Sequence, residues 1–348
     1  MKTSDFDYPL PPELIAQTPT EPRDHSRMMV IHRADGTIEH RLFFEIVEFL
    51  NPGDVLVLNQ SRVIPARLMG YRESGGKVEI LLLRRLEPCL WEALVRPSRR
   101  IGIGEMIRIA GKSDPSPESV TSVEVQVLEH WGEGLRTVRF ADEAILETLG
   151  EVALPPYIRA SLHDTERYQT VYARENGSVA APTAGLHFTP RLIQRLREKQ
   201  VELAFITLHV GLGTFRPVRV EDLSQHRMHS EYGEISVEAA KAIASARARG
   251  KRIFCVGTTT VRLLEQAALV SGEATVLKLF EGEANLFIVP GHRYRLVDCL
   301  LTNFHLPRST LLMLVSAFTG KELIDRAYRE AIQERYRFYS FGDCMLVL

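Results

Sequence analysis

Five short segments of this 348-residue chain combine glycine, threonine, histidine, asparagine and arginine without a periodic pattern. They are residues 59–62, 181–189, 209–215, 257–262 and 302–307, and most of them directly follow an apparent strand. Ligands bind at the carboxyl ends of strands in α/β folds, because backbone amides and loop side chains converge there. Histidine is suited to proton transfer near neutral pH. The pattern therefore predicts a ligand-binding site in which a histidine is available for proton transfer.

Each of these segments also has a structural interpretation. A histidine in a loop can be a hydrogen-bonded structural residue, and the threonines at 258–260 can cap a helix through their hydroxyls. Gly211 and Gly213 superficially resemble a dinucleotide-binding loop, but Arg216 stands where the third glycine belongs, so a nicotinamide site is not expected. The arginines within residues 96–100 form either a solvated surface run or a phosphate site. These alternatives stay open at the level of the sequence.

The elements expected to position the segments belong to two kinds of domain. Outside residues 62–150, apolar stretches typical of strands, such as 201–208 and 253–256, alternate with stretches typical of helices, which predicts a mostly parallel α/β sheet. Within residues 62–150, short strand candidates follow one another with turn-rich pieces between them, which predicts a small antiparallel β-barrel. We therefore expect an α/β domain of residues 1–61 plus 151–348, interrupted by a β-barrel domain.

Composition narrows the class of protein. Apolar residues make up 45% of the chain and charged residues 25%, which excludes a wholly disordered protein. The net charge of −1 excludes a histone-like basic protein, although it allows a local basic patch. We expect neither a signal peptide nor a membrane span, and hence a cytoplasmic protein without a membrane partner. The histidines and cysteines are dispersed, so no metal site is expected.

Taken in order, the segments resemble one family, the S-adenosylmethionine:tRNA ribosyltransferase-isomerases of queuosine biosynthesis. The matching stretches are residues 6–11, 14–17, 53–59, 62–67, 166–172, 181–189, 208–215, 228–231, 257–262, 302–307, 336–338 and 342–343. The resemblance covers essentially the whole chain and is weakest across residues 68–150. Gln60 and Ser61 stand where the family commonly has Asp and Thr, and Gly233 stands where a tyrosine is common. We therefore assign no catalytic role to Gln60.

The resemblance implies a fold and a reaction. The fold would be a barrel-like α/β catalytic domain with an inserted, six-stranded antiparallel β-barrel. The reaction would transfer and isomerise the ribosyl moiety of S-adenosylmethionine onto the 7-aminomethyl-7-deazaguanine base at the wobble position of tRNA, giving epoxyqueuosine-tRNA with release of adenine and methionine. S-adenosylmethionine would be a consumed substrate, so no cofactor is expected. The partners would be S-adenosylmethionine and the tRNA anticodon loop, and we expect the chain to act as a monomer.

That chemistry suggests roles for the matching residues. A base must remove the C5′ proton that the sulfonium acidifies, and the departing adenine needs an acid or strong hydrogen bonds. The candidate catalytic residues are His187, His209, Glu231 and His305, and we rank His187 and His209 first because each adjoins a glycine-bearing loop. Hydrogen bonds, bidentate arginine contacts and aromatic stacking would hold the substrates. The residues expected to make them are Asn59, Arg62, Arg67, Thr183, Gly185, Gly211, Gly213, Thr214, Phe215, Thr258, Thr259, Arg262, Asn303 and Phe304.

Two other functions compete with this interpretation. A non-catalytic RNA-binding module would explain the barrel and the local arginine pairs, but not the polar strand ends in the other domain. An S-adenosylmethionine-dependent tRNA methyltransferase would need a glycine-rich loop after its first strand, and residues 59–62 do not form one. The fate of S-adenosylmethionine therefore distinguishes the three functions.

Residues 163–179 lead directly into the segment at 181–189. They are polar and include a glycine, as catalytic lids commonly do. We predict that they form a mobile loop that becomes ordered over the substrates, and the alternative is an ordinary exposed linker.

Overall fold

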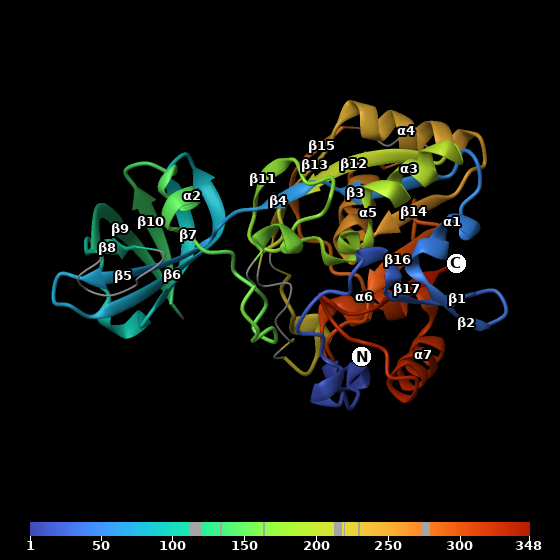
Figure 1. Cartoon of the computed structure of the whole chain (residues 1–348), viewed down its shortest axis with the longest axis horizontal. Helices are drawn as coiled ribbons and strands as arrows, with labels where there is room; N and C mark the ends of the chain where they lie inside the picture. Colours follow the sequence, from blue (N-terminus) through green and yellow to red (C-terminus); the bar gives the residue numbers. More distant parts are fainter. Residues whose placement is uncertain are drawn as a thin grey trace. The chain divides into compact units, whose positions relative to one another are not determined.

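The computed structural model describes residues 1–111, 120–132, 134–162, 164–211, 218, 220–228, 230–272 and 279–348. The chain forms two compact units (Figure 1). The first unit comprises Met1–Ser61, Pro155–Glu175 and Ala181–Leu348, and the second comprises Arg62–Leu154 and Asn176–Ala180. The second unit therefore extends four residues beyond residue 150 and includes a short piece that lies later in the sequence.

A nine-stranded mixed sheet forms the centre of the first unit. From edge to edge its strands are β15 (Phe280–Ala284), β13 (Glu231–Ile235), β12 (Glu202–Leu208), β3 (Val55–Asn59), β14 (Ile253–Val256), β16 (Cys299–Asn303), β17 (Cys344–Val347), β1 (Arg27–Ile31) and β2 (Ile38–Leu42).

The sheet is parallel only in part. The neighbours β12, β3, β14 and β16 are parallel, as are β17 and β1. The pairs β15–β13, β13–β12, β16–β17 and β1–β2 are antiparallel. The expectation of a mostly parallel sheet is therefore fulfilled at its centre and between β17 and β1, but not at the other neighbouring pairs. At the β1–β2 edge the reason is geometric, because six residues can close a hairpin but a parallel connection needs a dozen or more. In the described residues the sheet ends at two edge strands, so this unit is more open than a barrel.

Strand β3 shows why both faces of the sheet are covered. Its apolar residues 55–58 are all fully buried, and successive side chains of a strand point to opposite faces. Val55 and Val57 belong to one hydrophobic cluster, and Leu56 and Leu58 belong to another. The helices that contribute to the first cluster are α4 (Val237–Ala248), α5 (Thr258–Ser271), α6 (Thr310–Thr319) and α7 (Lys321–Gln333). Helices α1 (Ile46–Phe49) and α3 (Pro190–Glu198) contribute to the second.

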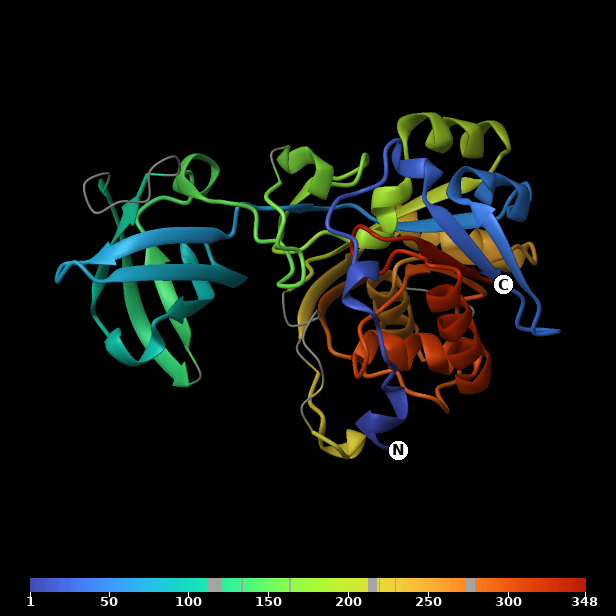
Figure 2. The same cartoon turned by 60° about the horizontal axis from the view of Figure 1, so that its bottom comes forward.

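Figure 2 shows the two helical layers on opposite sides of the sheet, with α6 and α7 in red and α3 in yellow-green. Parallel strands that are covered on both faces have continuously apolar sequences, and residues 55–58 show this pattern. Among the described helices, none is long and apolar enough to cross a membrane.

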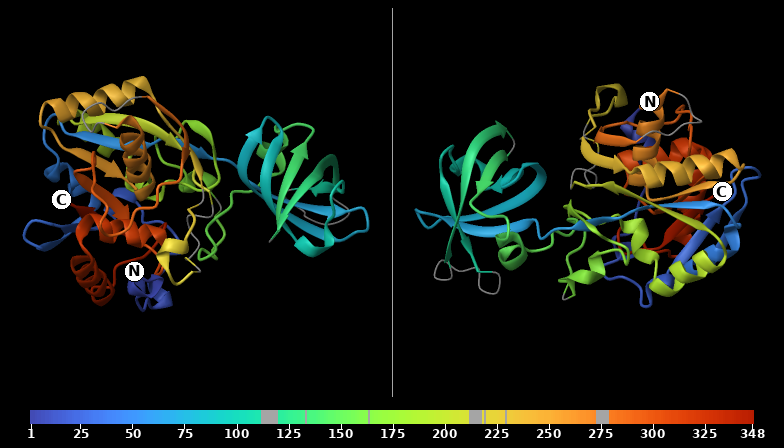
Figure 3. Two further views of the ribbon diagram at one scale, coloured as in Figure 1. Left: turned by 180° about the vertical axis from the view of Figure 1, so that it is seen from behind. Right: turned by 90° about the horizontal axis from the view of Figure 1, so that it is seen from above.

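The second unit is a closed six-stranded barrel (Figure 3). Around the barrel its strands are β10 (Leu135–Phe140), β7 (Leu90–Arg96), β6 (Lys77–Glu87), β5 (Arg67–Arg72), β8 (Met106–Ala110) and β9 (Val120–Gly132). All six neighbouring pairs are antiparallel. Val78, Ile80 and Leu82 of β6 are fully buried at alternating positions, as inward-facing residues of a small barrel must be. A short helix, α2 (Ile145–Leu149), follows the last strand. The prediction of an α/β protein with an inserted six-stranded antiparallel barrel is confirmed.

The segment that follows residue 163 is packed along part of its length. Tyr168 is fully buried, and the guanidinium of Arg23 donates to the carbonyls of Gln169 at 2.7 Å and Glu166 at 2.9 Å. The segment ends in β11 (Glu175–Ser178), which pairs with β4 (Ser61–Val63). These contacts argue against a loop that is mobile throughout, and His163 itself lies outside the described residues.

Candidate functional site

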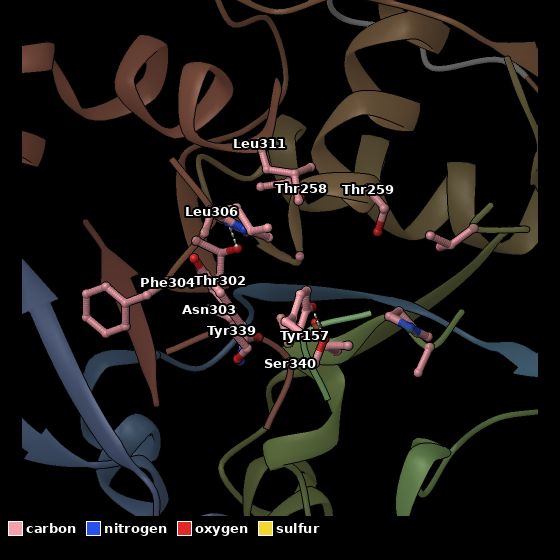
Figure 4. Close-up of a pocket in the computed structure, with 17 residues that line it drawn as sticks. Tyr157, Thr258, Thr259, Thr302, Asn303, Phe304, Leu306, Leu311, Tyr339 and Ser340 are labelled. Atoms are coloured by element: carbon pink, nitrogen blue, oxygen red, sulfur yellow. Dashed lines mark hydrogen bonds between the residues drawn. The ribbon is translucent and has the colours of Figure 1, made fainter. Parts of the chain in front are cut away.

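A pocket lies at the carboxyl ends of the parallel strands β14 and β16 (Figure 4). Three of the five segments singled out in the sequence line it, through residues 181–184, 257–259 and 302–306, and Val210 comes from a fourth segment. About 490 Å³ of space, part of it open to solvent, lies between these residues. Loops that follow separate parallel strands thus meet at one edge of the sheet, as expected for ligand binding in open α/β folds.

A sharp turn at Gly257 brings the start of α5 into this pocket. Gly257 has a φ of 91°, a conformation that favours glycine, and its amide donates to the carbonyl of Leu301 at 2.8 Å. The helix therefore begins immediately after β14, and its first two residues, Thr258 and Thr259, line the pocket. The amides of a first helical turn have no partner within the helix and carry a partial positive charge. Polar or anionic ligand groups are therefore favoured on this side.

His305 is the member of the candidate catalytic set that lines the pocket. Its Nε2 lies 2.8 Å from the hydroxyl of Thr302, and its amide donates to the hydroxyl of Tyr328 at 2.9 Å. Its carbonyl accepts a hydrogen bond from Tyr8. These contacts hold the backbone and the ring in place. Burial lowers the pKa of His305 to about 3, so its imidazole is neutral at physiological pH.

His187 lies behind the pocket wall and is not among the residues that line it. Its Nδ1 is 2.7 Å from the hydroxyl of Ser26, and its Nε2 is 3.3 Å from the amide nitrogen of Asn303. Burial, helped by the positive charges of Arg23 and Arg337, lowers the pKa of His187 to about 3. Both ring nitrogens are therefore engaged by protein groups, and the ring is neutral.

Asn303 carries a buried acceptor that has no partner in the described part of the chain. The residue lines the pocket and is 2% exposed. Its amide nitrogen donates to the carbonyl of Tyr339 at 3.0 Å, but its Oδ1 has no hydrogen-bond partner. An unsatisfied buried acceptor costs about 1–3 kcal/mol. A ligand that donates a hydrogen bond to Oδ1 would remove this cost.

Glu231 and Arg262 form a buried ion pair away from the pocket-lining residues. The two side chains are 5% and 4% exposed, and the other carboxylate oxygen of Glu231 accepts from the amide of Gly211 at 3.1 Å. Burial lowers the pKa of Arg262 to about 10, and its Nε is buried without a partner. His209 stacks on Tyr232 nearby in the sheet with ring centroids 6.0 Å apart, and its Nδ1 is buried with no partner among the residues that the structure describes. Burial lowers the pKa of His209.

Several residues expected to bind substrate make structural contacts within the protein instead. The side chain of Asn59 donates to the carbonyl of Leu208 at 2.9 Å and accepts from the amide of Leu208 at 3.1 Å, which ties β3 to β12. The ring of Phe304 is fully buried among aromatic rings, with its centroid 4.9 Å from that of Phe338. Figure 4 shows this ring directed away from the other labelled residues. Gly185 packs on Tyr172, whose hydroxyl lies 2.1 Å from the point where a Cβ would be.

The remaining residues expected to bind substrate lie in different parts of the structure. Thr183, Thr258 and Thr259 line the pocket. Arg62 and Arg67 belong to the second unit, where Arg67 lies 3.3 Å from the carboxylate of Glu79. Gly213, Thr214 and Phe215 lie outside the described residues.

The two departures from the family pattern lie in well-packed surroundings. The amide of Gln60 donates to the carbonyl of Ile206 at 2.9 Å, and its side chain lies 3.4 Å from the hydroxyl of Thr207. At Gly233 a Cβ would lie 2.5 Å from a methyl group of Leu263. A larger residue there would require Leu263 to move.

Four pocket residues were not singled out from the sequence, namely the apolar Leu311 and three residues with hydroxyls. Tyr157, Tyr339 and Ser340 line the pocket, and the hydroxyls of Tyr157 and Ser340 are 2.7 Å apart. The two tyrosine rings are 4.7 Å apart, and Tyr339 has a positive φ of 69°, which is uncommon outside glycine and occurs at functional sites. Tyr339 and Ser340 directly follow the stretch 336–338, which matches the family, so their position beside that stretch could have indicated that they belong to the site. Tyr157 follows two prolines and gave no comparable signal.

Comparisons with known proteins agree over the length of the chain. A protein family described as "Queuosine biosynthesis protein" matches residues 3–347. The S-adenosylmethionine:tRNA ribosyltransferase-isomerases of Dehalococcoides mccartyi and Moorella thermoacetica are 53% and 55% identical to this chain, and each match covers 100% of both chains. A crystal structure of the S-adenosylmethionine tRNA ribosyltransferase from Thermotoga maritima superimposes with a TM-score of 0.56 at 41% identity, covering 99% of this chain and 100% of that one.

Proposed function

Because the chain belongs to the family of queuosine biosynthesis proteins, we propose that it is an S-adenosylmethionine:tRNA ribosyltransferase-isomerase. It transfers and isomerises the ribosyl moiety of S-adenosylmethionine onto the 7-aminomethyl-7-deazaguanine base at the wobble position of tRNA, and adenine and methionine leave. The observation that carries this conclusion is the convergence of segments far apart in the sequence, all within the family resemblance, on one pocket. S-adenosylmethionine is a substrate and not a methyl donor in this reaction.

The pocket suits a nucleoside with an amino-acid chain. Thr258 and Thr259 offer hydroxyls at the start of α5, and Asn303 offers an unsatisfied acceptor for an ammonium or a ribose hydroxyl. Tyr157 and Tyr339 supply the aromatic surface on which adenine or a displaced base stacks. Polar groups and an aromatic pair thus line one pocket, which is how sites for small molecules achieve orientation.

His305 is the histidine best placed for the proton transfer. It lines the pocket, whereas His187 and His209 do not, and this reverses our ranking from the sequence. The sulfonium acidifies the C5′ hydrogen, and the neutral imidazole of His305 can take that proton. Departing adenine needs one proton, which the resulting imidazolium can supply. A single proton therefore balances both steps, and His305 serves first as base and then as acid.

Glu231 and Arg262 would act by positioning rather than by touching the substrate. The two charges pair with each other, and the other carboxylate oxygen of Glu231 accepts from the amide of Gly211, immediately after the pocket residue Val210. The pair thus fixes the chain where it leaves the sheet. Its removal would loosen this part of the pocket wall.

The remaining properties follow from the reaction. The partners are S-adenosylmethionine and the anticodon loop of a tRNA, whose unpaired bases can be reached without melting a duplex. All pocket-lining residues come from the first unit, and action as a monomer is part of the proposal. A substrate tRNA places the protein in the cytoplasm.

The products of S-adenosylmethionine test the proposal. The enzyme is incubated with S-adenosylmethionine labelled in its ribose and with a tRNA that carries 7-aminomethyl-7-deazaguanine. We expect equal amounts of adenine and methionine, with the label retained on the tRNA. Formation of S-adenosylhomocysteine would show a methyltransferase instead, and tRNA binding without any product would show an RNA-binding module. A tRNA with guanine at the wobble position is the matched control and should give no product.

A further inference from the structure

One end of the barrel carries arginines that the proposed reaction does not use. Between Glu92 and Glu105 the sequence contains three arginines, at 96, 99 and 100, and no carboxylate. Arg99 and Arg100 lie in a short 3-10 turn, η5 (Ser98–Arg100), and both are exposed. The second unit therefore presents two neighbouring guanidinium groups on one turn.

The hairpin of β9 and β10 lies against this turn. The amide of Val95 donates to the carbonyl of Gly134 at 2.9 Å, and a Cβ on Gly134 would lie 3.3 Å from that of Ser98. Three residues before Gly134 is Trp131, which is 64% exposed. Its Nε1 donates to the hydroxyl of Thr137 at 3.0 Å. The indole is thus anchored by its only donor while its ring stays available to a partner.

A further arginine, Arg136, lies buried beneath the same turn. Arg136 shares the inward register of β10 with Val138 and Phe140, and it is 1% exposed. Its guanidinium donates to the carbonyls of Leu135 at 2.9 Å and Ser98 at 2.6 Å, and its Nε has no partner in the described part of the barrel. No carboxylate within the described ranges forms an ion pair with Arg136. A buried cation without a counterion is costly, and an anion at this end of the barrel would reduce that cost.

We propose that this end of the barrel, with Arg99 and Arg100 on its turn and Trp131 on the adjoining hairpin, binds the sugar–phosphate backbone of RNA. Guanidinium groups recognise phosphates through two parallel hydrogen bonds, and Arg99 and Arg100 are both exposed to make them. Trp131 adds a flat apolar surface for a base or a ribose. The inference rests on the proposed function only for the identity of the RNA, which is the substrate tRNA outside the base that reacts.

RNA fits this surface better than a lipid surface. An anionic membrane attracts many basic residues on one face, whereas this end has two exposed arginines on its turn and one anchored aromatic ring. Arginine beside an exposed aromatic ring is the combination with which proteins bind single-stranded and looped RNA. The charge supplies affinity, and the ring supplies a contact that does not depend on salt.

The test measures tRNA affinity of the full-length enzyme in a titration of KCl, without turnover. Arg99→Ala/Arg100→Ala should raise the Kd for tRNA about tenfold. It should also lower the slope of log affinity against log salt by about 1.5, because each phosphate contact contributes about 0.7–0.9. Trp131→Ala should raise the Kd about fivefold without changing the slope. The matched control is Arg108→Ala/Arg139→Ala, which removes two exposed arginines from strands of the same barrel and should change the Kd less than twofold.

The outcomes separate this proposal from the proposed function. Turnover at saturating tRNA should stay within twofold of wild type in all these variants, because none of them touches the pocket. Equal losses in the control variant, or no loss in Arg99→Ala/Arg100→Ala, would overturn the inference. So would unchanged tRNA affinity together with arginine-dependent binding to phosphatidylglycerol vesicles. If wild-type enzyme released no adenine, the proposed function would fail, while the binding titration would still decide the role of the barrel.

Discussion

The side-chain amide of Asn303 donates to Nε2 of His187 across 3.3 Å. The same amide nitrogen lies 3.0 Å from the carbonyl of Tyr339, which can only accept, so the orientation of the amide is fixed. Nε2 of His187 must then be the accepting nitrogen, and Nδ1 carries the proton and donates to the hydroxyl of Ser26 at 2.7 Å. His187 therefore holds Asn303 so that its free Oδ1 is left for a ligand.

Replacement of His305 tests the proton transfer. His305→Ala should lower single-turnover product formation at least ~100-fold, since loss of a general base or acid costs ~10²–10⁴-fold. The affinity for tRNA should persist, because the change lies in the pocket for the small substrate. His187→Ala, His209→Ala and Glu231→Ala are measured beside it. Near wild-type turnover in His305→Ala, with an inactive His187→Ala or His209→Ala, would place the base elsewhere.

The stability of the protein should fall in mild acid. Burial holds the pKa values of His187 and His305 at about 3, whereas histidine in an unfolded chain titrates near 6.5. Between these pH values the unfolded state binds protons that the folded state does not, so the free energy of unfolding decreases as pH falls from about 6.5 towards 3. Each histidine contributes up to about 1.4 kcal/mol per pH unit.

Urea denaturation at pH 7.5 and pH 5.5 measures this effect. We expect a lower midpoint at pH 5.5 for the wild type and a smaller decrease for His187→Gln. The exposed residue His25 provides the control, and His25→Gln should retain the wild-type decrease. An unchanged pH dependence in His187→Gln would contradict the assignment of a buried neutral ring.

The close contact at Gly185 should make it intolerant of a side chain. In Gly185→Ala the new Cβ would lie 2.1 Å from the hydroxyl of Tyr172, so we expect a loss of roughly 2–4 kcal/mol in the free energy of unfolding. That hydroxyl is buried without a partner, so Tyr172→Phe alone should be neutral or stabilising. The double variant Gly185→Ala/Tyr172→Phe should recover part of the loss. Thermal unfolding of the three variants checks this prediction. Gly102→Ala is the control, because there is open space at the position of its Cβ. Equal losses of stability in Gly185→Ala and in the double variant would show that the hydroxyl is not the obstacle.

The ion pair of Arg262 and Glu231 should show strong coupling. Glu231→Gln or Arg262→Met leaves one buried charge without its partner and should cost about 3–5 kcal/mol of stability. The double variant removes both charges and should be more stable than the sum of the two single losses predicts. A double-mutant cycle from denaturation curves measures the coupling energy. Simple additivity would mean that the two side chains do not depend on each other.

The sequence by itself determined the elements and the family. A small antiparallel barrel follows from short strand candidates, such as the segment of Val78, Ile80 and Leu82, separated by turn-rich pieces, while its six strands were implied by the family resemblance. The apolar run at 55–58 likewise indicated a strand covered on both faces. The segments at 181–189, 257–262 and 302–307 were recognised because strand ends are local features. Each of these properties is encoded within a few consecutive residues.

Only the tertiary structure decided which of the expected residues share the pocket. His187 and His305 look alike in the sequence, yet one is bound on both ring nitrogens behind the wall and the other lines the cavity. Phe304 was expected to stack on a base, but its neighbours are aromatic residues distant in sequence, and their packing takes the ring into the core. Arginine is usually exposed at the protein surface, but Arg136 occupies an inward position of β10, so the barrel buries it. The physical reason is common to all three: the direction and environment of a side chain depend on contacts between residues far apart in the chain, and these exist only once the strands are paired.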